Sequence, residues 1–120
     1  MSDFRKLSVW QKAHRLTLDI YRATTTFPQN ELYGLTSQMR RCCVSIGSNI
    51  AEGCGRSGEV EKARFLRIAK GSVSELEYQV LVCCDLEYLQ PDVGKKITGQ
   101  VQEVGRMLSS LTDKVRAATA

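Results

Sequence analysis

The chain has 120 residues, of which 42% are hydrophobic and 25% charged, and its formal net charge is +4. This composition is ordinary for a folded globular domain and excludes disordered and collagen-like chains. No stretch approaches the roughly 18 apolar residues of a membrane-spanning helix. The mixed, charged residues 1–12 do not resemble a secretory signal. We therefore expect a cytoplasmic protein without membrane contact.

Apolar residues recur at intervals of three and four in four successive segments, which is the spacing of one helix face. The longest seam runs from Leu66 to Cys83. No stretch alternates in the manner of a strand for more than a few residues. The pattern predicts four amphipathic helices, over residues 8–26, 34–53, 58–89 and 91–118.

The expected helix ends follow local signals in chain order. Ser8 and Gln11 match a capping box at the start of the first helix. Gly53 predicts a left-handed cap at the end of the second helix, and Ser57 or Gly58 is expected to cap the third. Pro91 suits the first turn of the fourth, where its missing N–H costs nothing.

Short connections between these helices favour antiparallel neighbours. The sequence therefore predicts an all-α fold, an antiparallel up-down-up-down four-helix bundle that forms a single domain over residues 1–120.

The five cysteines do not suggest a disulfide framework, because their number is odd and no secretory signal is expected. Adjacent cysteines do not have the usual spacing of zinc ligands, although four thiolates from two helices could surround a metal. The spacing favours small residues packed at a helix interface. The residues concerned are Cys42, Cys43, Cys54, Cys83 and Cys84.

Gly53, Gly55 and Gly58 fit the G-x-G-x-x-G pattern of dinucleotide-binding loops. That pattern requires a preceding strand, and a helix is expected here instead. A phosphate beside Arg56 at the start of the third helix is the weaker remaining possibility. The single histidine, His14, has no expected catalytic partner. We predict no catalytic residue, no metal site and no cofactor.

Clustered basic residues leave one binding hypothesis, because arginine and lysine suit phosphate groups. The alternative is a solvated surface of ion pairs. The candidate residues for nucleic-acid contact are Lys12, Arg15, Arg22, Arg40, Arg41, Arg56, Arg64, Arg67 and Lys70.

The third helix carries more apolar residues than one buried stripe requires, which favours packing against another subunit. The alternative is a broad core stripe in a monomer. The candidate interface residues are Trp10, Phe65, Ile68, Ser72 and Val82.

Six segments together resemble the bacterial four-helix-bundle proteins encoded in 23S rRNA intervening sequences. They are Phe4–His14, Tyr33–Arg41, Ser48–Gly53, Arg64–Ser72, Ser74–Glu77 and Asp85–Leu89. The resemblance implies a homopentameric ring without enzymatic activity. The family is also similar to the accessory variability protein of diversity-generating retroelements, a basic pentamer that binds a reverse transcriptase and nucleic acid. Two positions depart from the family pattern: Gly47, where many relatives have proline, and Glu87, where glycine is common.

The leading hypothesis is a non-enzymatic homo-oligomer that contacts RNA, or an RNA-handling protein such as a reverse transcriptase, through its arginines. The alternative is a structural or scaffolding oligomer that binds no nucleic acid.

Overall fold

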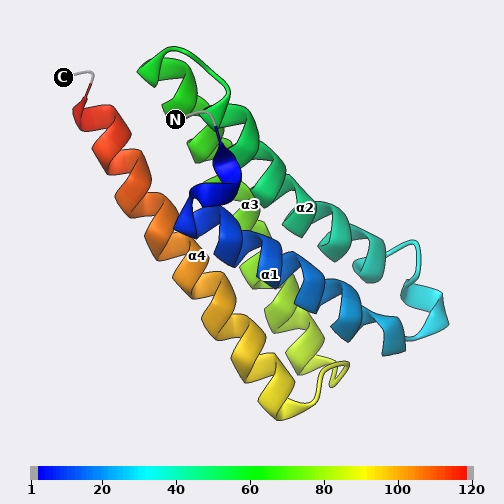
Figure 1. Ribbon diagram of the computed structural model, residues 1–120. Coiled ribbons are helices and arrows are strands. Elements are labelled where there is room, and N and C mark those ends of the chain that lie inside the picture. The colour runs from blue at the N-terminus through cyan, green and yellow to red at the C-terminus, as the bar shows by residue number, and fades with distance from the viewer. Residues whose placement is uncertain (1–2, 119–120) are drawn as a thin grey trace.

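Four α-helices make up most of this computed structural model, which describes residues 3–118 (Figure 1). No strand occurs within that range, so the prediction of an all-α fold with four helices is confirmed. The ends of the predicted domain, residues 1–2 and 119–120, lie outside the described range. The helices are α1 (Ser8–Ala23), α2 (Leu35–Cys54), α3 (Glu59–Asp85) and α4 (Pro91–Ala117), with short 3₁₀ turns at Phe4–Lys6, Thr24–Thr26 and Gln29–Glu31.

Consecutive helices run in opposite directions and form a bundle of 47 × 22 × 21 Å (Figure 1). α1 packs against α2 and α4, and α3 packs against the same two helices. α1 and α3 therefore occupy opposite corners of the bundle, with α2 and α4 at the corners between them. The homopentameric ring remains a prediction.

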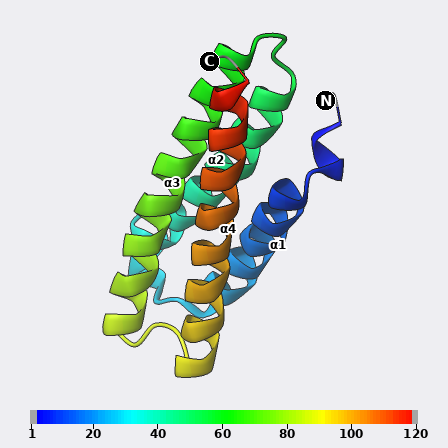
Figure 2. The same cartoon turned by 90° about the vertical axis from the view of Figure 1, so that its left-hand side faces the viewer.

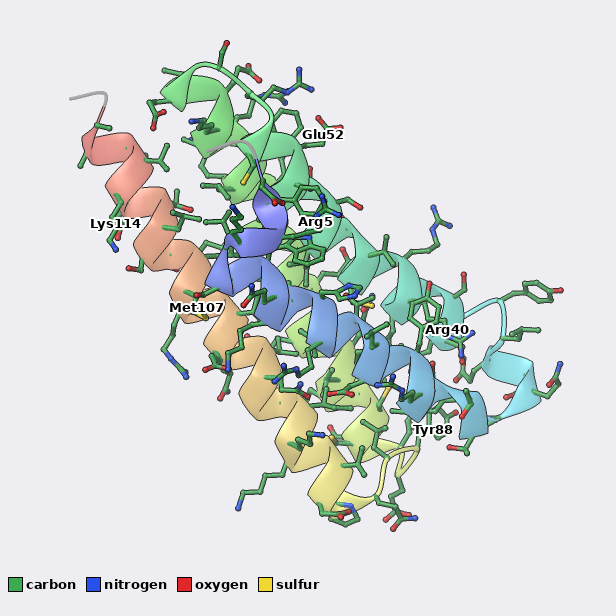
Figure 3. All side chains as sticks on the ribbon, viewed as in Figure 1. Arg5, Arg40, Glu52, Tyr88, Met107 and Lys114 are labelled. Atoms are coloured by element: carbon green, nitrogen blue, oxygen red, sulfur yellow. The ribbon has the colours of Figure 1, made fainter. Side chains whose placement is uncertain are left out.

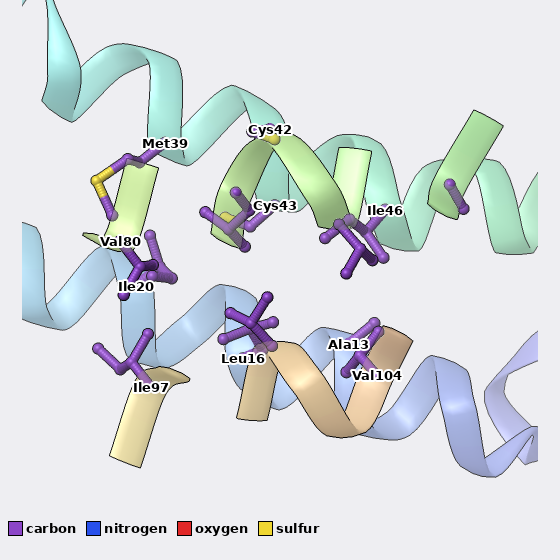
Figure 4. Close-up of a cluster of buried hydrophobic side chains, with 14 of the residues drawn as sticks. Ala13, Leu16, Ile20, Met39, Cys42, Cys43, Ile46, Val80, Ile97 and Val104 are labelled. Carbon is purple, nitrogen blue, oxygen red and sulfur yellow. The ribbon is translucent and has the colours of Figure 1, made fainter. Parts of the chain in front are cut away.

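The predicted apolar stripes face one another along the bundle axis, as Figure 4 shows for side chains from all four helices. Leu16 and Ile20 of α1, Ile46 of α2, Leu76 of α3 and Leu108 of α4 are fully buried. Burying a side chain of this size contributes about 1.5–3 kcal/mol. No helix can hide its stripe alone, because each stripe is covered by the others.

The start of α1 differs from the predicted capping box. Ser8 is already helical, and Leu7 is the capping residue, without a side-chain hydrogen bond. The Gln11 amide instead donates to the Arg5 carbonyl at 2.8 Å. The capping-box prediction is wrong because the preceding 3₁₀ turn brings that carbonyl within reach of Gln11.

The end of α2 also differs from the prediction. The helix continues to Cys54, and Gly55 follows with a φ of −82°, in the right-handed region. The predicted left-handed glycine cap is therefore wrong. Gly53 instead packs closely against α3, where an added Cβ would lie 3.3 Å from the Cβ of Phe65.

A left-handed residue follows the end of α3, and not the end of α2 as the sequence predicted. α3 ends at Asp85, before the predicted residue 89, and Glu87 has a φ of 62°. The Tyr88 N–H donates to the Cys83 carbonyl at 2.9 Å, and the Glu87 N–H donates to the Cys84 carbonyl at 3.0 Å. These two bonds form a Schellman motif, in which glycine is the usual left-handed residue. The chain therefore turns four residues earlier than predicted and leads into α4.

Glu31 joins the two loops at this end of the bundle. One of its oxygens accepts from the Leu35 N–H at 3.3 Å, at the start of α2, and the other accepts from the Tyr88 hydroxyl at 2.9 Å. The Tyr88 ring lies 5.3 Å from the Phe27 ring, and Figure 3 marks Tyr88 at this end. The hydrogen bond to Glu31 raises the pKa of Tyr88 above its usual value. The α1–α2 connection is thus fixed to the turn between α3 and α4.

We expect Glu87→Gly to stabilise the protein by about 1 kcal/mol, because glycine adopts a positive φ without the steric cost of a side chain. Chemical denaturation measures the change. Lys70→Gly, in the middle of α3, is the control and should destabilise by roughly 0.5–1 kcal/mol. A loss of stability in Glu87→Gly would contradict the left-handed conformation at this position.

Candidate nucleic-acid interface

The nine basic residues predicted to contact nucleic acid do not form one surface. Those on α1 and those on α3 lie at opposite corners of the bundle, with α2 and α4 between them. Figure 1 shows α1 in front of the bundle and α3 behind it. A single patch made by both helices is therefore excluded.

Four of the nine residues form ion pairs with neighbouring carboxylates. Exposed pairs of this kind contribute only about 0–1 kcal/mol to stability. The adjacent negative charge nevertheless opposes the approach of a phosphate. The pairs are Lys12 with Glu103 (3.6 Å), Arg22 with Asp19 (3.4 Å), Arg56 with Glu52 (3.0 Å) and Arg64 with Glu61 (3.3 Å).

Arg56 was the residue expected beside a phosphate at the start of α3. Its guanidinium is paired with Glu52 and lies 4.8 Å from the centre of the Phe65 ring. Both contacts hold it against its own chain. The structure therefore gives no support to a phosphate site in this loop.

Arg40 connects α2 to the end of α1. Its guanidinium donates to the Thr24 hydroxyl at 2.9 Å and to the Tyr21 carbonyl at 3.3 Å, and it lies 4.9 Å from the centre of the Tyr21 ring. Figure 3 shows Arg40 at this end of the bundle. The side chain is half-buried. Its role is to join two helices, and the prediction that it contacts nucleic acid is not supported.

Arg67 and Lys70 are different, because neither has an ion pair or hydrogen bond with another described residue. Both are exposed and line the seam between α3 and α4, which lie side by side in Figure 2. A hollow of about 460 Å³ in this seam is bordered by Lys70, Ser74, Arg106 and Ser109.

A second hollow continues along the same seam, where Arg67 faces Asp113 and Arg116 of α4. We call the surface formed by Arg67, Lys70, Ser74, Arg106, Ser109 and Arg116 the α3/α4 groove. Two carboxylates also border it: Asp113, and Glu77, which accepts a hydrogen bond from Gln102 at 3.4 Å. Basic side chains outnumber acidic ones, so the groove attracts anions.

Reasoning from the sequence missed the contributions of α4 and of the two serines. Arg106 and Arg116 stand on the polar side of the fourth apolar repeat, where helix spacing identifies them as exposed. Spacing within one helix does not reveal which neighbouring helix they face. Arg15 and Arg41, two further unpaired candidates, lie on α1 and α2, outside the groove.

The buried cysteines pack as small core residues, as the spacing favoured. Cys42 donates to the Ser72 carbonyl at 3.0 Å, and the Cys83 sulfur lies 3.2 Å from that of Met39. Burial raises the pKa of Cys42 and of Cys83 to about 12, and that of Cys43 to about 11. These three thiols are therefore protonated at neutral pH and poorly reactive.

His14 and the five cysteines all lie within the described residues. His14 stacks on Trp10 with ring centres 4.8 Å apart. Within residues 3–118, no group of three or more His, Cys, Asp or Glu side chains is placed to hold a metal ion. In the same range, no helix combines the length and apolar character needed to cross a membrane.

The predicted subunit-interface residues fall into two places. Trp10 lies on α1, where its ring contacts Phe4 and His14 of its own chain. The other four candidates lie on α3, where Ile68 is 41% exposed and the Ser72 hydroxyl is 3.1 Å from that of Ser45 on α2. Within residues 3–118, no ring contact or side-chain hydrogen bond links Trp10 to the α3 candidates. The candidates selected from the sequence omit two exposed apolar residues of α3, Val60 and Leu81.

Fold and groove together define a helical-bundle protein with a basic surface between its two longest helices. Residues 5–110 match the 23S rRNA-intervening sequence protein family, and the chain belongs to that family. The predicted family is confirmed. No protein among the curated proteins matches this sequence.

The fold is also similar to a crystal structure from Bacteroides thetaiotaomicron, described as a protein with unknown function from the S23 ribosomal protein family. The TM-score is 0.78 and the sequence identity 22%, over 87% of this chain and 97% of that one. At this identity the similarity concerns the fold alone.

We expect Arg40→Ala to lower the free energy of unfolding by about 1–2 kcal/mol, because it removes two charged hydrogen bonds that connect α2 to the end of α1. Arg41→Ala is a matched control on the next residue. It should change stability by less than about 0.5 kcal/mol, because its exposed side chain has no recorded partner among the described residues. Equal effects in urea denaturation would contradict the role assigned to Arg40.

We expect stability to fall as pH rises from 9 towards 11. The unfolded thiols ionise near 9.0, while burial keeps Cys42, Cys43 and Cys83 protonated up to about 11 to 12. Below pH 9 the thiols are protonated in both states, and the free energy of unfolding does not depend on them. Above pH 9, each thiol lowers the free energy of unfolding by roughly 1 kcal/mol per pH unit. Urea midpoints at pH 8 and pH 10.5 measure the change. A Cys42→Ala/Cys83→Ala double variant should be less sensitive to pH, and an unchanged slope would contradict the assignment.

Proposed function

We propose that this protein is a non-enzymatic, cytoplasmic helical-bundle protein that binds the phosphate backbone of RNA through the α3/α4 groove. The observation that supports this best is the convergence of Arg67, Lys70 and Arg106 on one seam without recorded ion-pair partners among the described residues. Unpaired cations attract phosphates without first breaking an internal ion pair.

The chemistry of the groove suits phosphate oxygens. Arginine donates in a planar fork that fits two oxygens at once, and lysine supplies a compact charge. Binding cationic side chains to phosphates releases counterions, so affinity should fall steeply with salt. The five unpaired cysteines are compatible with a reducing compartment, which is why the proposal includes the cytoplasm.

Self-association is part of the same proposal, with the ring of five subunits that the family resemblance implies. Exposed Ile68 and Tyr78 of α3, which do not border the groove, favour a subunit contact on that helix. Several copies would present several grooves to one RNA and would multiply the phosphate contacts. An RNA-handling protein, such as a reverse transcriptase, is a further proposed partner.

A scaffolding oligomer that binds no nucleic acid is the second candidate function. The same exposed apolar residues of α3 favour it, because they account for assembly without any role for the groove. Sedimentation would then give a defined oligomer in a protein that fails to bind RNA. The two candidates are therefore separated by RNA affinity and not by oligomeric state.

The test compares two triple variants that remove the same charge from different places. We expect Arg67→Ala/Lys70→Ala/Arg106→Ala to weaken RNA binding about tenfold or more, and to lower the slope of log affinity against log salt by roughly 2–3. Lys12→Ala/Arg15→Ala/Arg22→Ala on α1 is the matched control and should have a much smaller effect.

Fluorescence anisotropy with a labelled structured RNA, from low to near-physiological salt, measures both quantities. Circular dichroism confirms that each variant is folded. Equal losses in the two triple variants would mean that net charge alone drives binding. Absence of binding by the unmodified protein at low salt would reject RNA binding and favour the scaffold.

A further inference from the structure

The α3/α4 groove contains no ring on which a base could stack. None of the side chains bordering its two hollows is aromatic. Of the two most exposed tyrosines, Tyr78 follows Ser74 by one turn of α3 without bordering either hollow, and Tyr33 is in the connection between α1 and α2. Proteins that hold single strands generally stack bases on aromatic side chains. The groove lacks that feature, although its cations suit the sugar-phosphate backbone.

Two serine hydroxyls lie among the cations of the groove. Ser74 of α3 and Ser109 of α4 border the same hollow as Lys70 and Arg106. Neither serine hydroxyl has a hydrogen-bond partner among the described residues. A hydroxyl both donates and accepts, and it can therefore bond to a ribose 2′-OH as well as to a phosphate oxygen.

Close packing of the two helices gives the hollow its shape. Gly105 lies at the seam, where an added Cβ would be 3.3 Å from a methyl carbon of Val73. An added side chain at this position would require the Val73 side chain to shift slightly. The short side chains of Ser74 and Ser109 then leave a hollow on the outside of the seam, between Lys70 and Arg106.

The charged positions extend along the bundle. Arg106 and Arg116 are both on α4, about 15 Å apart along its axis at 1.5 Å per residue. Arg67 and Lys70 lie one turn apart on the facing helix. An extended row of cations with no stacking ring fits a ligand that presents phosphates outside and keeps its bases inside.

We infer that the groove recognises double-stranded RNA by its backbone, with cations on the phosphates and the serine hydroxyls on 2′-hydroxyl groups, and without reading the bases. This inference rests on the proposed function and specifies which form of RNA the site takes. Duplex RNA displays its 2′-hydroxyls and phosphates across a wide, shallow minor groove, which suits recognition by shape.

The experiment uses the full chain and four labelled probes: an RNA duplex of about 16 base pairs, a second RNA duplex of unrelated sequence, a DNA duplex of the first sequence, and one strand of the first RNA. Anisotropy at one fixed salt concentration gives the four affinities. We expect the two RNA duplexes to bind equally, and to bind about tenfold more tightly than either the DNA duplex or the single strand.

A Ser74→Ala/Ser109→Ala variant tests the hydroxyl contacts. Alanine is favourable in a helix, so the variant should fold normally. It should lose most of the preference for RNA duplex over DNA duplex while keeping the salt slope of the unmodified protein, because the cations remain. An unchanged preference would overturn the role of the serines.

The outcomes separate this inference from the proposed function. Single-stranded RNA that binds as tightly as the duplex, or affinity that differs between the two duplex sequences, overturns the inference and leaves RNA binding in place. Failure of all four probes to bind at low salt rejects both.

Discussion

Burial of the four apolar stripes determines which polar surfaces become neighbours in this protein. The stripes of α1 and α3 both pack against α2 and α4, so the outer sides of α1 and α3 point to opposite corners of the bundle. The basic residues of α1 are thereby separated from those of α3. The same packing brings α3 and α4 together and aligns Lys70 with Arg106 across the seam.

The difference between paired and unpaired cations matters more to the candidate site than their number. Arg64 is close to Arg67 in the sequence, yet it is paired with Glu61, and Arg40 holds two helices together. Each has an internal partner that an RNA phosphate would have to displace. Arg67 and Lys70 have none recorded among the described residues. Surface charge alone, counted along the chain, would not distinguish these two groups.

Local sequence signals were less reliable than periodicity at the helix ends. The seam from Leu66 to Cys83 is buried as its spacing predicted, because a stripe of this length must face a core. Gly53 suggested a left-handed cap at the end of α2, but that conformation occurs at Glu87 instead. Where a helix stops depends on where the next one must begin. Tertiary packing therefore overrides the preference of single residues for a cap.

The sequence by itself determined the all-α class, the existence and approximate limits of the four helices, and the family. These properties follow from periodicity within a segment and from motifs that are local in the chain. Only the tertiary structure decided that Arg40 joins α1 to α2, that Ser72 of α3 lies beside Ser45 of α2, and that Arg106 borders the same hollow as Lys70. These are contacts between helices. Their geometry depends on how each helix is rotated against its neighbours, and spacing along one helix carries no information about that rotation.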